Sequence, residues 1–225
     1  MRVEIFSDIA CPWCYIGKRR FQKALSEYEH ADDVEVVWRS FELDPNAPKH
    51  ETGLTIDKLV AKYGVDRDEA RRMMAGATEQ AATVGLEFNL EQAREANTFD
   101  AHRLTHLAAT VGLQEELFEA FMSAYQVDGE YLGSHETLER LAVQAGLDRD
   151  AVRSVLTSDA YADAVRDDQL RARRLGVSGV PFFVFDSTSG ISGAQSSDYF
   201  LRALEQLGAQ SRSASRATAS REPVA

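Results

Sequence analysis

The segment that most constrains the fold of this chain is SDIACPWCYIG, residues 7–17, which contains both of its cysteines, Cys11 and Cys14. The residues before it, VEIFS, alternate in polarity and predict a strand. After it, apolar residues recur at helical spacing and predict a helix over roughly 13–29. Residues 33–43 are rich in β-branched and aromatic side chains and predict a second strand. The chain therefore opens as strand, helix, strand, with the cysteine pair where the helix begins.

The remainder of the chain separates into a helical block and a second strand-forming end. Residues 51–175 show no strand pattern, and capping and glycine signals predict about six helices there. Strands are predicted again at 179–186 and in the ISGAQ segment, and an amphipathic helix follows them. We therefore expect one α/β domain made of residues 1–50 plus 176–208, with an all-helical insertion over 51–175. Residues 209–225 are small and polar without periodicity and predict a disordered tail.

The spacing of the two cysteines is compatible with three kinds of site. A structural zinc site needs about four ligands. This chain offers two cysteines and five scattered histidines, so we expect no metal and no other cofactor. Two inert buried thiols are the second interpretation, and a redox pair is the third. The position of the pair favours redox chemistry, because the unpaired N–H groups and the dipole at a helix N-terminus favour the thiolate of Cys11.

A redox pair gives the two cysteines different roles. Cys11 attacks a disulfide of the substrate, and Cys14, one turn further into the helix, resolves the mixed disulfide. Pro181 is a second unusual feature, because proline cannot donate a hydrogen bond within a strand. A cis Val180–Pro181 bond at the start of the strand would remove this conflict. An ordinary trans proline before an edge strand is the alternative.

Three separate motifs, CPWC, NTFDAHRL and GVSGVPFFVFD, occur in an order that resembles proteins of the DsbA family, and in particular its FrnE-like branch. The resemblance implies a thioredoxin-like α/β fold with a large all-helical insertion. It also implies the activity of a thiol–disulfide oxidoreductase or disulfide isomerase. In such a protein Cys11 is the attacking thiol, Cys14 the resolving thiol, and Pro181 a cis-proline that faces them.

Five further residues are candidates for binding the substrate. The resemblance implies that Val180 presents its backbone to the substrate. Pro12 restrains the loop, and Trp13 offers an apolar surface to an extended peptide. Trp13 stands where periplasmic DsbA has histidine, and the loss of that positive charge predicts a less strongly oxidising protein. Asn97 and His102 begin a helix of the insertion, a region that packs over the active site in the family; a structural role for His102 is the alternative.

Charge and hydropathy limit the partners of the chain. It has 25 basic and 36 acidic residues, a net charge of −11, which argues against binding to nucleic acid. Its first residues lack the apolar core of a signal peptide, and no segment is apolar enough to span a membrane, so we expect a cytoplasmic protein with no membrane partner. The expected partner is a protein or peptide that carries a disulfide or thiol, with glutathione or another small thiol as a further candidate.

Two other functions stay open at this point. The first is a glutathione-dependent isomerase or transferase of the 2-hydroxychromene-2-carboxylate isomerase type. Proteins of that type typically carry serine at the first position of the motif and lack the second cysteine, whereas this chain has Cys11 and Cys14. The second is a peptide-binding holdase chaperone, in which the insertion and Trp13 offer apolar surface and the cysteines are incidental.

Overall fold

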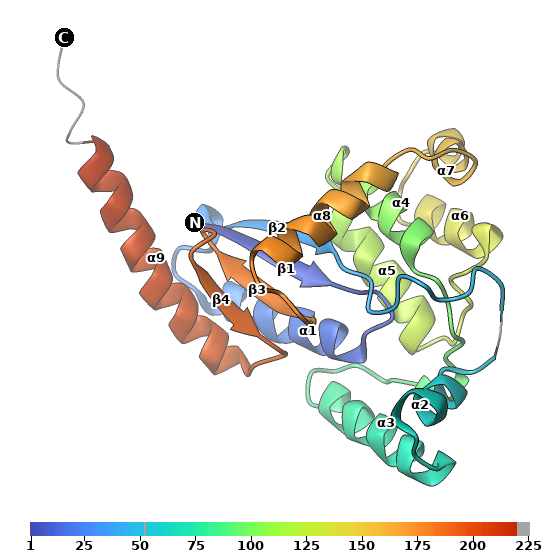
Figure 1. Cartoon of the computed structure of the whole chain (residues 1–225). Coiled ribbons are helices and arrows are strands. Elements are labelled where there is room, and N and C mark those ends of the chain that lie inside the picture. The colour runs from blue at the N-terminus through green and yellow to red at the C-terminus, as the bar shows by residue number, and fades with distance from the viewer. Residues whose placement is uncertain (52, 220–225) are drawn as a thin grey trace.

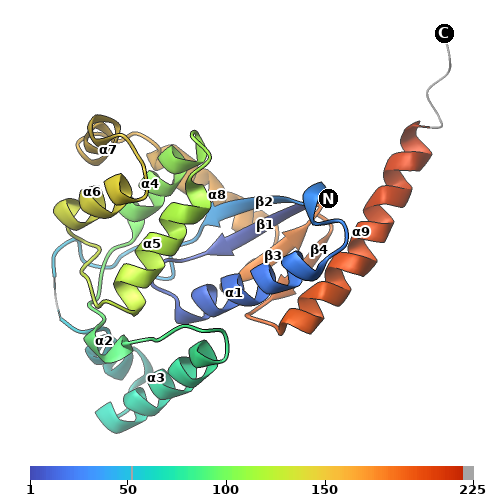
Figure 2. The same cartoon turned by 180° about the vertical axis from the view of Figure 1, so that it is seen from behind.

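A four-stranded sheet with helices on both faces forms the centre of the molecule (Figures 1 and 2). The computed structural model describes residues 1–51 and 53–219, with side chains up to residue 213. In chain order the elements are β1 (Arg2–Ser7), α1 (Pro12–Glu27), the 3-10 turn η1 (Ala31–Asp33), β2 (Glu35–Ser40), α2 (Thr55–Tyr63), α3 (Arg67–Ala82), the 3-10 turn η2 (Leu90–Gln92), α4 (Phe99–Ala109), α5 (Gln114–Gln126), α6 (His135–Gln144), α7 (Arg149–Leu156), α8 (Ala162–Arg174), β3 (Phe182–Phe185), β4 (Ser189–Ser192) and α9 (Ser197–Ala219).

The sheet joins the two ends of the chain. Its strand order is β2-β1-β3-β4. β1 and β2 are parallel, with Ile5 opposite Trp38, and α1 is the helix that connects them. β3 is antiparallel to β1, with Phe183 opposite Ile5, and forms a hairpin with β4. The prediction of one α/β unit built from both ends of the chain, with helices inserted between them, is therefore confirmed.

Alternation along the central strands divides the core between the two faces of the sheet. Ile5 and Phe183 point toward α1 and α9, where Phe21 of α1 lies 5.3 Å from Phe183 between ring centroids and Phe200 of α9 lies 4.5 Å from Phe183. Phe6 points to the opposite face and joins a separate cluster with α8. A shift of one residue in register would exchange these two sets, so burial on both faces fixes the pairing of the strands.

Helices of the insertion share the core of the sheet. The ring centroids of Trp38 in β2 and Phe118 in α5 are 5.2 Å apart, and those of Tyr15 in α1 and Phe88 are 5.9 Å apart. This shared packing makes the insertion continuous with the sheet. The domain boundaries 1–50 plus 176–208 and 51–175 stay a prediction. Among the described helices, none combines the length and the apolar character that a membrane span requires.

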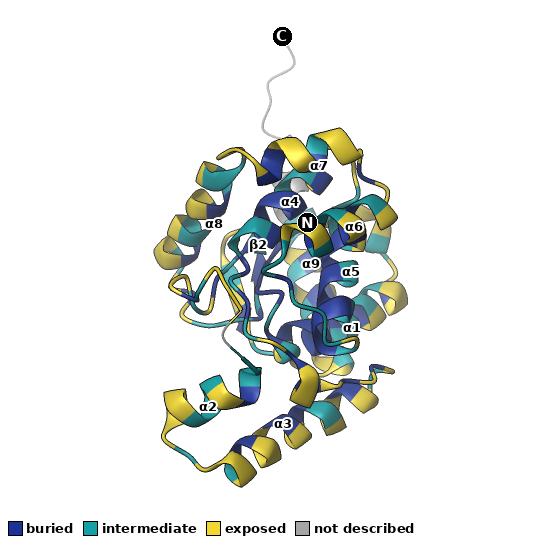
Figure 3. Ribbon diagram, turned by 90° about the vertical axis from the view of Figure 1, so that its right-hand side faces the viewer, coloured by how far each residue is buried: buried dark blue, intermediate teal, exposed yellow. Residues whose placement is uncertain are grey.

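The helices α2 and α3 form a pair at one end of the molecule, and much of their surface is exposed (Figure 3). The chain enters and leaves this pair at the same point, because Leu54 and Arg94 form an isolated antiparallel bridge. Beside it the Thr55 amide donates to the Ala93 carbonyl at 2.8 Å. The segment that contains α2 and α3 therefore starts and ends at neighbouring points, which backbone hydrogen bonds hold together.

Two sequence-based predictions need correction. In the described part of the chain, seven α-helices rather than six lie between β2 and β3. The missing one is α7, a short helix capped by Asp148, whose carboxylate accepts from the Ala151 amide at 2.9 Å. The predicted tail over 209–225 is helical as far as Ala219, since α9 continues beyond its buried anchor Phe200 and alanine and serine there allow it to propagate. Residues 220–225 lie outside the described residues.

Candidate functional site

Cys11 is the residue immediately before α1. After β1 ends, the Cys11 amide donates to the Asp8 carbonyl at 3.1 Å and closes a turn. Pro12 occupies the first position of α1, where its missing N–H removes no helix hydrogen bond. The Cys14 amide then donates to the Cys11 carbonyl at 3.0 Å. The Cys11 side chain therefore lies at a helix N-terminus, beside backbone N–H groups that have no partner within the helix.

Cys14 lies against Cys11 and is the more deeply buried of the two. Both are free thiols, with 4% of Cys11 and 1% of Cys14 exposed. Burial raises the pKa of the Cys14 thiol well above its usual value, and the adjacent Cys11 sulfur raises it further. At neutral pH Cys14 is thus a protonated thiol in contact with Cys11, from which a disulfide between the two can close.

The segment before β3 meets the cysteine pair from the other end of the sequence. The Val180–Pro181 peptide bond is cis, the first of the two alternatives that the sequence left open. The Cys11 thiol donates to the Val180 carbonyl, with 3.7 Å between sulfur and oxygen. Pro181 packs on α1, and a Cβ atom added to Gly17 would lie only 3.0 Å from its Cγ. A side chain at position 17 would therefore push Pro181 away from the thiols.

A cavity of about 280 Å³ opens beside Cys11. Pro12 and Trp13 border it, and Trp13 is 42% exposed at its edge. The other lining residues come from α2, α3, α5 and the segments that follow β2 and α3. Their side chains are mainly aromatic, aliphatic and sulfur-containing, and they include Leu43, Leu59, Tyr63, Met73, Met74 and Tyr125.

Two of the predicted substrate-binding residues do not face this cavity. The Asn97 side chain donates to the Ala47 carbonyl at 2.8 Å and accepts from the Phe99 amide at 3.0 Å, so it holds the start of α4. His102 is fully buried, with its Nε2 atom 3.5 Å from a carboxylate oxygen of Asp8. It lies behind Asp8, which does border the cavity. Neither residue therefore lines the cavity, because their positions are set by long-range contacts that the motif could not show, and their role in substrate binding stays a prediction.

The side of the cavity formed by α2 and α3 was not predicted from the sequence. Tyr63 and Met73 are the clearest signal that was available, because they are large apolar residues on helices that are otherwise mostly polar. Such residues are usually core filler at helical spacing. Both are exposed in the structure and border the cavity instead.

A charged cluster fixes α1 to α5 behind the cysteines. Glu119 of α5 accepts hydrogen bonds from Tyr15, Lys18 and Arg19 of α1, that from Lys18 at 2.7 Å. Burial alone would raise the pKa of Glu119, but the hydrogen bonds from Lys18 and Tyr15 outweigh it and lower the pKa below its usual value. Burial and the hydrogen bond to Glu119 raise the pKa of Tyr15 to about 12. The helix that begins directly after Cys11 and contains Cys14 is therefore fixed to α5.

A Ser–His–Asp cluster elsewhere in the molecule does not have the geometry of a hydrolytic triad. The Oγ atom of Ser40 lies 3.2 Å from Nε2 of His106, and Asp168 lies 3.1 Å from the same nitrogen. A triad needs the serine on one ring nitrogen and the carboxylate on the other. Ser40 is also buried, and its amide donates to Asp168 at 2.9 Å. The cluster instead ties β2 to α4 and α8.

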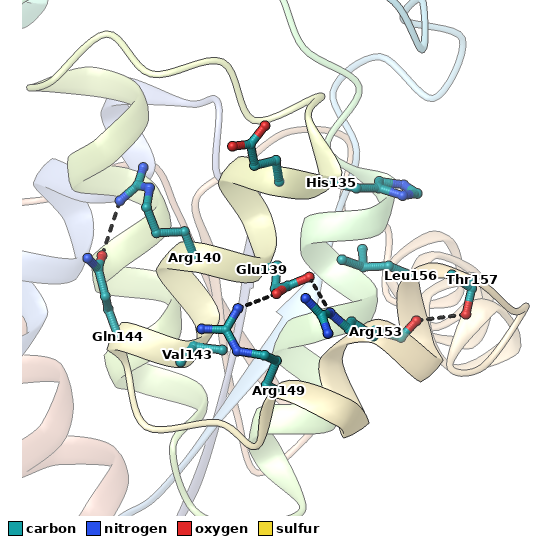
Figure 4. A pocket seen from close by; sticks show the side chains of 10 residues that line it. His135, Glu139, Arg140, Val143, Gln144, Arg149, Arg153, Leu156 and Thr157 are labelled. Carbon is teal, nitrogen blue, oxygen red and sulfur yellow. Dashed lines mark hydrogen bonds and ion pairs between the residues drawn. The ribbon is translucent and has the colours of Figure 1, made fainter.

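A second hollow, of about 700 Å³, lies between α6 and α7 (Figure 4). Glu139 at its centre accepts hydrogen bonds from Arg149 and Arg153, and Arg140 donates to Gln144 at 3.1 Å. Glu139 is therefore paired with two arginines of α7, and Arg140 also pairs with Glu130. Within the described ranges, no set of three or more His, Cys, Asp and Glu side chains is placed to hold a metal ion.

Comparisons with known proteins agree with this geometry. A family model described as a DSBA-like thioredoxin domain matches residues 2–205. The crystal structure of a probable DsbA oxidoreductase from Streptomyces coelicolor is 45% identical, with a TM-score of 0.89, and the match covers 100% of this chain and 93% of that one.

More distant structures share the fold. A 2-hydroxychromene-2-carboxylate isomerase is 15% identical, with a TM-score of 0.70, and the match covers 96% of this chain and 98% of that one. The cytosolic disulfide reductase DsbM from Pseudomonas aeruginosa, determined with GSH, is 17% identical, with a TM-score of 0.63 and coverage of 92% and 98%. The predicted thioredoxin-like fold with a helical insertion is therefore confirmed.

Proposed function

Because the chain belongs to the DSBA-like thioredoxin domain family, we propose that it catalyses thiol–disulfide exchange through Cys11 and Cys14. One observation carries the proposal: two free, neighbouring thiols lie at the N-terminus of α1, and the Val180 carbonyl lies 3.7 Å from the outer sulfur. Assignment to the FrnE-like branch of the family stays a prediction.

The two cysteines act in sequence. The Cys11 sulfur attacks one sulfur of a substrate disulfide, a bond forms between them, and the other substrate sulfur leaves as a thiolate that takes up a proton. Cys14 then gives up its proton, attacks the Cys11 sulfur and releases the second substrate thiol. Two electrons pass to the substrate, and a Cys11–Cys14 disulfide forms. The same steps run backwards when an oxidised protein meets a dithiol.

Redox titration followed by mass spectrometry tests this assignment. The oxidised protein is expected to be two mass units lighter than the reduced protein, and the change is expected to reverse with dithiothreitol. The Cys14→Ser variant is expected to accumulate a mixed disulfide on Cys11, whereas Cys11→Ser is expected to lose exchange activity altogether. If Cys11 and Cys14 form no reversible bond with each other, the proposed function is wrong.

Two competing functions predict different results with the same variants. A glutathione-dependent isomerase or transferase would keep its activity in Cys14→Ser and would require glutathione. The contact between Cys14 and Cys11 favours dithiol chemistry instead. A peptide-binding holdase would suppress aggregation equally well after both cysteines are changed to serine.

The proposal also includes the direction of electron flow and the location of the protein in the cell. A DsbM structure in the same fold is described as a cytosolic disulfide reductase, and we include a cytoplasmic location and net reduction or isomerisation in the proposed function. Insulin reduction compared with refolding of a scrambled disulfide protein separates these activities. A reductase accelerates only the first reaction, and an isomerase also accelerates the second.

A further inference from the structure

The cavity beside Cys11 is surrounded by an unusual concentration of exposed apolar side chains. Among the residues whose side chains the structure describes, seven large apolar residues are exposed. Four of them border this cavity: Trp13, Leu43, Tyr63 and Met73. Exposed apolar surface that gathers around one hollow is typical of a binding site, whereas scattered apolar residues are ordinary.

Most polar groups that border the cavity already have partners within the protein, and the amine of Lys62, which also borders it, lies over the Tyr63 ring at 5.6 Å from the centroid. Lys58 donates to Asp44 and is paired with Glu95, with nitrogen–oxygen distances of 2.7 and 2.8 Å. The hydroxyl groups of Thr55 and Tyr125 are 2.9 Å apart and bond to each other. Because Lys58 and these hydroxyl groups are paired, a charged ligand would lose water and gain at most the Lys62 amine as a partner. Charge complementarity therefore favours an uncharged occupant.

The size of the cavity and the burial of Cys11 limit the occupant further. The cavity volume of about 280 Å³ is at the lower end of the range for sites that bind small ligands. Only 4% of Cys11 is exposed. A sulfur this buried is poorly accessible to a disulfide that is fixed in the surface of a folded protein. A slender molecule can reach it through the cavity.

We propose that this cavity binds the apolar part of a small, uncharged disulfide, preferably aromatic, which Cys11 and Cys14 reduce to two thiols. The inference rests on the proposed exchange activity and names its substrate class, in place of the protein or peptide disulfide expected from the sequence. Trp13, Tyr63 and Met73 supply aromatic and thioether contacts to a ring. The Cys11 sulfur bonds to one substrate sulfur, Cys14 releases the second, and the two leaving thiolates take the protons of the two cysteines.

Single-turnover kinetics with the reduced protein test the inference, and no added reductant is needed. The probes are 2,2′-dithiodipyridine, which is aromatic and uncharged, bis(2-hydroxyethyl) disulfide, which is uncharged and polar, and glutathione disulfide, which is charged. Each rate constant is divided by that of dithiothreitol with the same probe, which removes differences in intrinsic reactivity. The normalised rate constant for the aromatic probe is expected to exceed the other two by about tenfold or more, because burial of an aromatic ring in the cavity stabilises the complex by that factor.

Two variants test whether the cavity causes the preference for the aromatic probe. Met73→Asp places a charge at the edge of the cavity and is expected to lower the ratio of the aromatic to the hydroxyethyl rate by about fivefold or more. Leu170→Asp, a change at another exposed apolar residue on a helix away from the cavity, is the control and is expected to leave this ratio unchanged. Circular dichroism verifies that both variants are folded.

Other outcomes contradict the inference or the function on which it rests. Equal normalised rate constants for all three probes would show that the cavity does not select the substrate, while the exchange activity would stand. A cystine peptide with phenylalanine beside the cysteine, reduced faster than the dipyridyl probe, would identify a peptide as the occupant and overturn the small-molecule class. If no probe oxidises the Cys11–Cys14 pair, the proposed function itself is wrong.

Discussion

Two helices of equal length border the site, and they are attached to the molecule in different ways. α1 and α3 each have 16 residues. α1 buries large side chains, among them Tyr15, Ile16 and Phe21, between the sheet, α5 and α9. The buried residues of α3 are three alanines and Met74. Since stability grows with the apolar area removed from water, α1 is held far more firmly than α3.

The contrast suggests that α1 and the pair of α2 and α3 have different roles at the cavity. α1 contains Cys14 and begins directly after Cys11, and exchange between the two requires that their sulfur atoms keep a fixed distance and orientation. The pair of α2 and α3 contributes only surface to the cavity, and its position depends on the bridge between Leu54 and Arg94 and on the ion pairs of Lys58. Because α2 and α3 are weakly attached, they can shift to fit substrates of different shape without moving the two cysteines.

The largest difference is expected between truncations in the two helices. Phe21→Ala removes a ring packed against Phe183 and Phe200 and is expected to lower the free energy of unfolding by about 3–5 kcal/mol. Met74→Ala in α3 is expected to lower it by about 2 kcal/mol, at the low end of the range, since Met74 already borders open volume. Urea unfolding followed by circular dichroism measures both. Equal losses would contradict the contrast between the helices.

A second prediction concerns the anchor of α1 on α5. Glu119→Gln is expected to lower the free energy of unfolding by about 2 kcal/mol at pH 7, because Lys18 is left buried with a weaker partner. The folded-state pKa of Glu119 lies below its unfolded value. Its stabilising effect is therefore fully present above the unfolded pKa of about 4.3 and is lost as the pH falls through the lowered folded value.

Urea unfolding of the wild type and Glu119→Gln between pH 3 and 7 measures this effect. The two stabilities are expected to converge at the acidic end. A constant difference over the whole range would show that the carboxylate charge does not anchor α1. Glu116→Gln, on the same helix, is the control, since Glu116 is not part of the cluster around Lys18.

A third prediction concerns the rate at which Cys14 resolves a mixed disulfide. Burial, the main cause of the raised pKa of Cys14, remains after Cys11 has bonded to a substrate. Below that pKa the thiolate fraction increases tenfold with each pH unit, so the rate of resolution is expected to rise about tenfold per unit from pH 6 to at least 8.5, the usual cysteine value. Rapid acid quenching and mass spectrometry of the mixed disulfide provide the rates. A plateau below pH 8 would mean that another group activates Cys14.

The smallest effect is expected for the ion pairs that hold α2. Lys58→Gln removes contacts to Asp44 and Glu95 and is expected to lower the free energy of unfolding by about 1 kcal/mol or less. Amide hydrogen exchange is expected to accelerate in α2 and α3 and to stay unchanged in α1. Lys62→Gln on the same helix is the control, and equal acceleration by both variants would exclude a specific role for Lys58.

Much of the site could be predicted because it depends on neighbours in the sequence. The helix that begins after Cys11 and the contact between Cys11 and Cys14 follow from a strand, a proline and helical spacing within about 20 residues. Pro181 could be identified for the same reason, since a proline at the start of an apolar strand is unusual wherever the strand pairs. Asn97 and His102 lie away from the cavity, because the motif that contains them specifies a helix but not the direction in which its residues point.

The sequence by itself determined the order of the elements, the βαβ opening and the presence of a paired thiol site at a helix start. These features arise from local hydrogen bonding and periodicity, which act between residues close in the chain. Only the tertiary structure brought Val180 to Cys11 across 169 positions, left Met73 and Tyr63 exposed beside a cavity, and buried His102 behind Asp8. Such contacts depend on how distant segments pack together, and a pattern along one segment does not specify its neighbours in space.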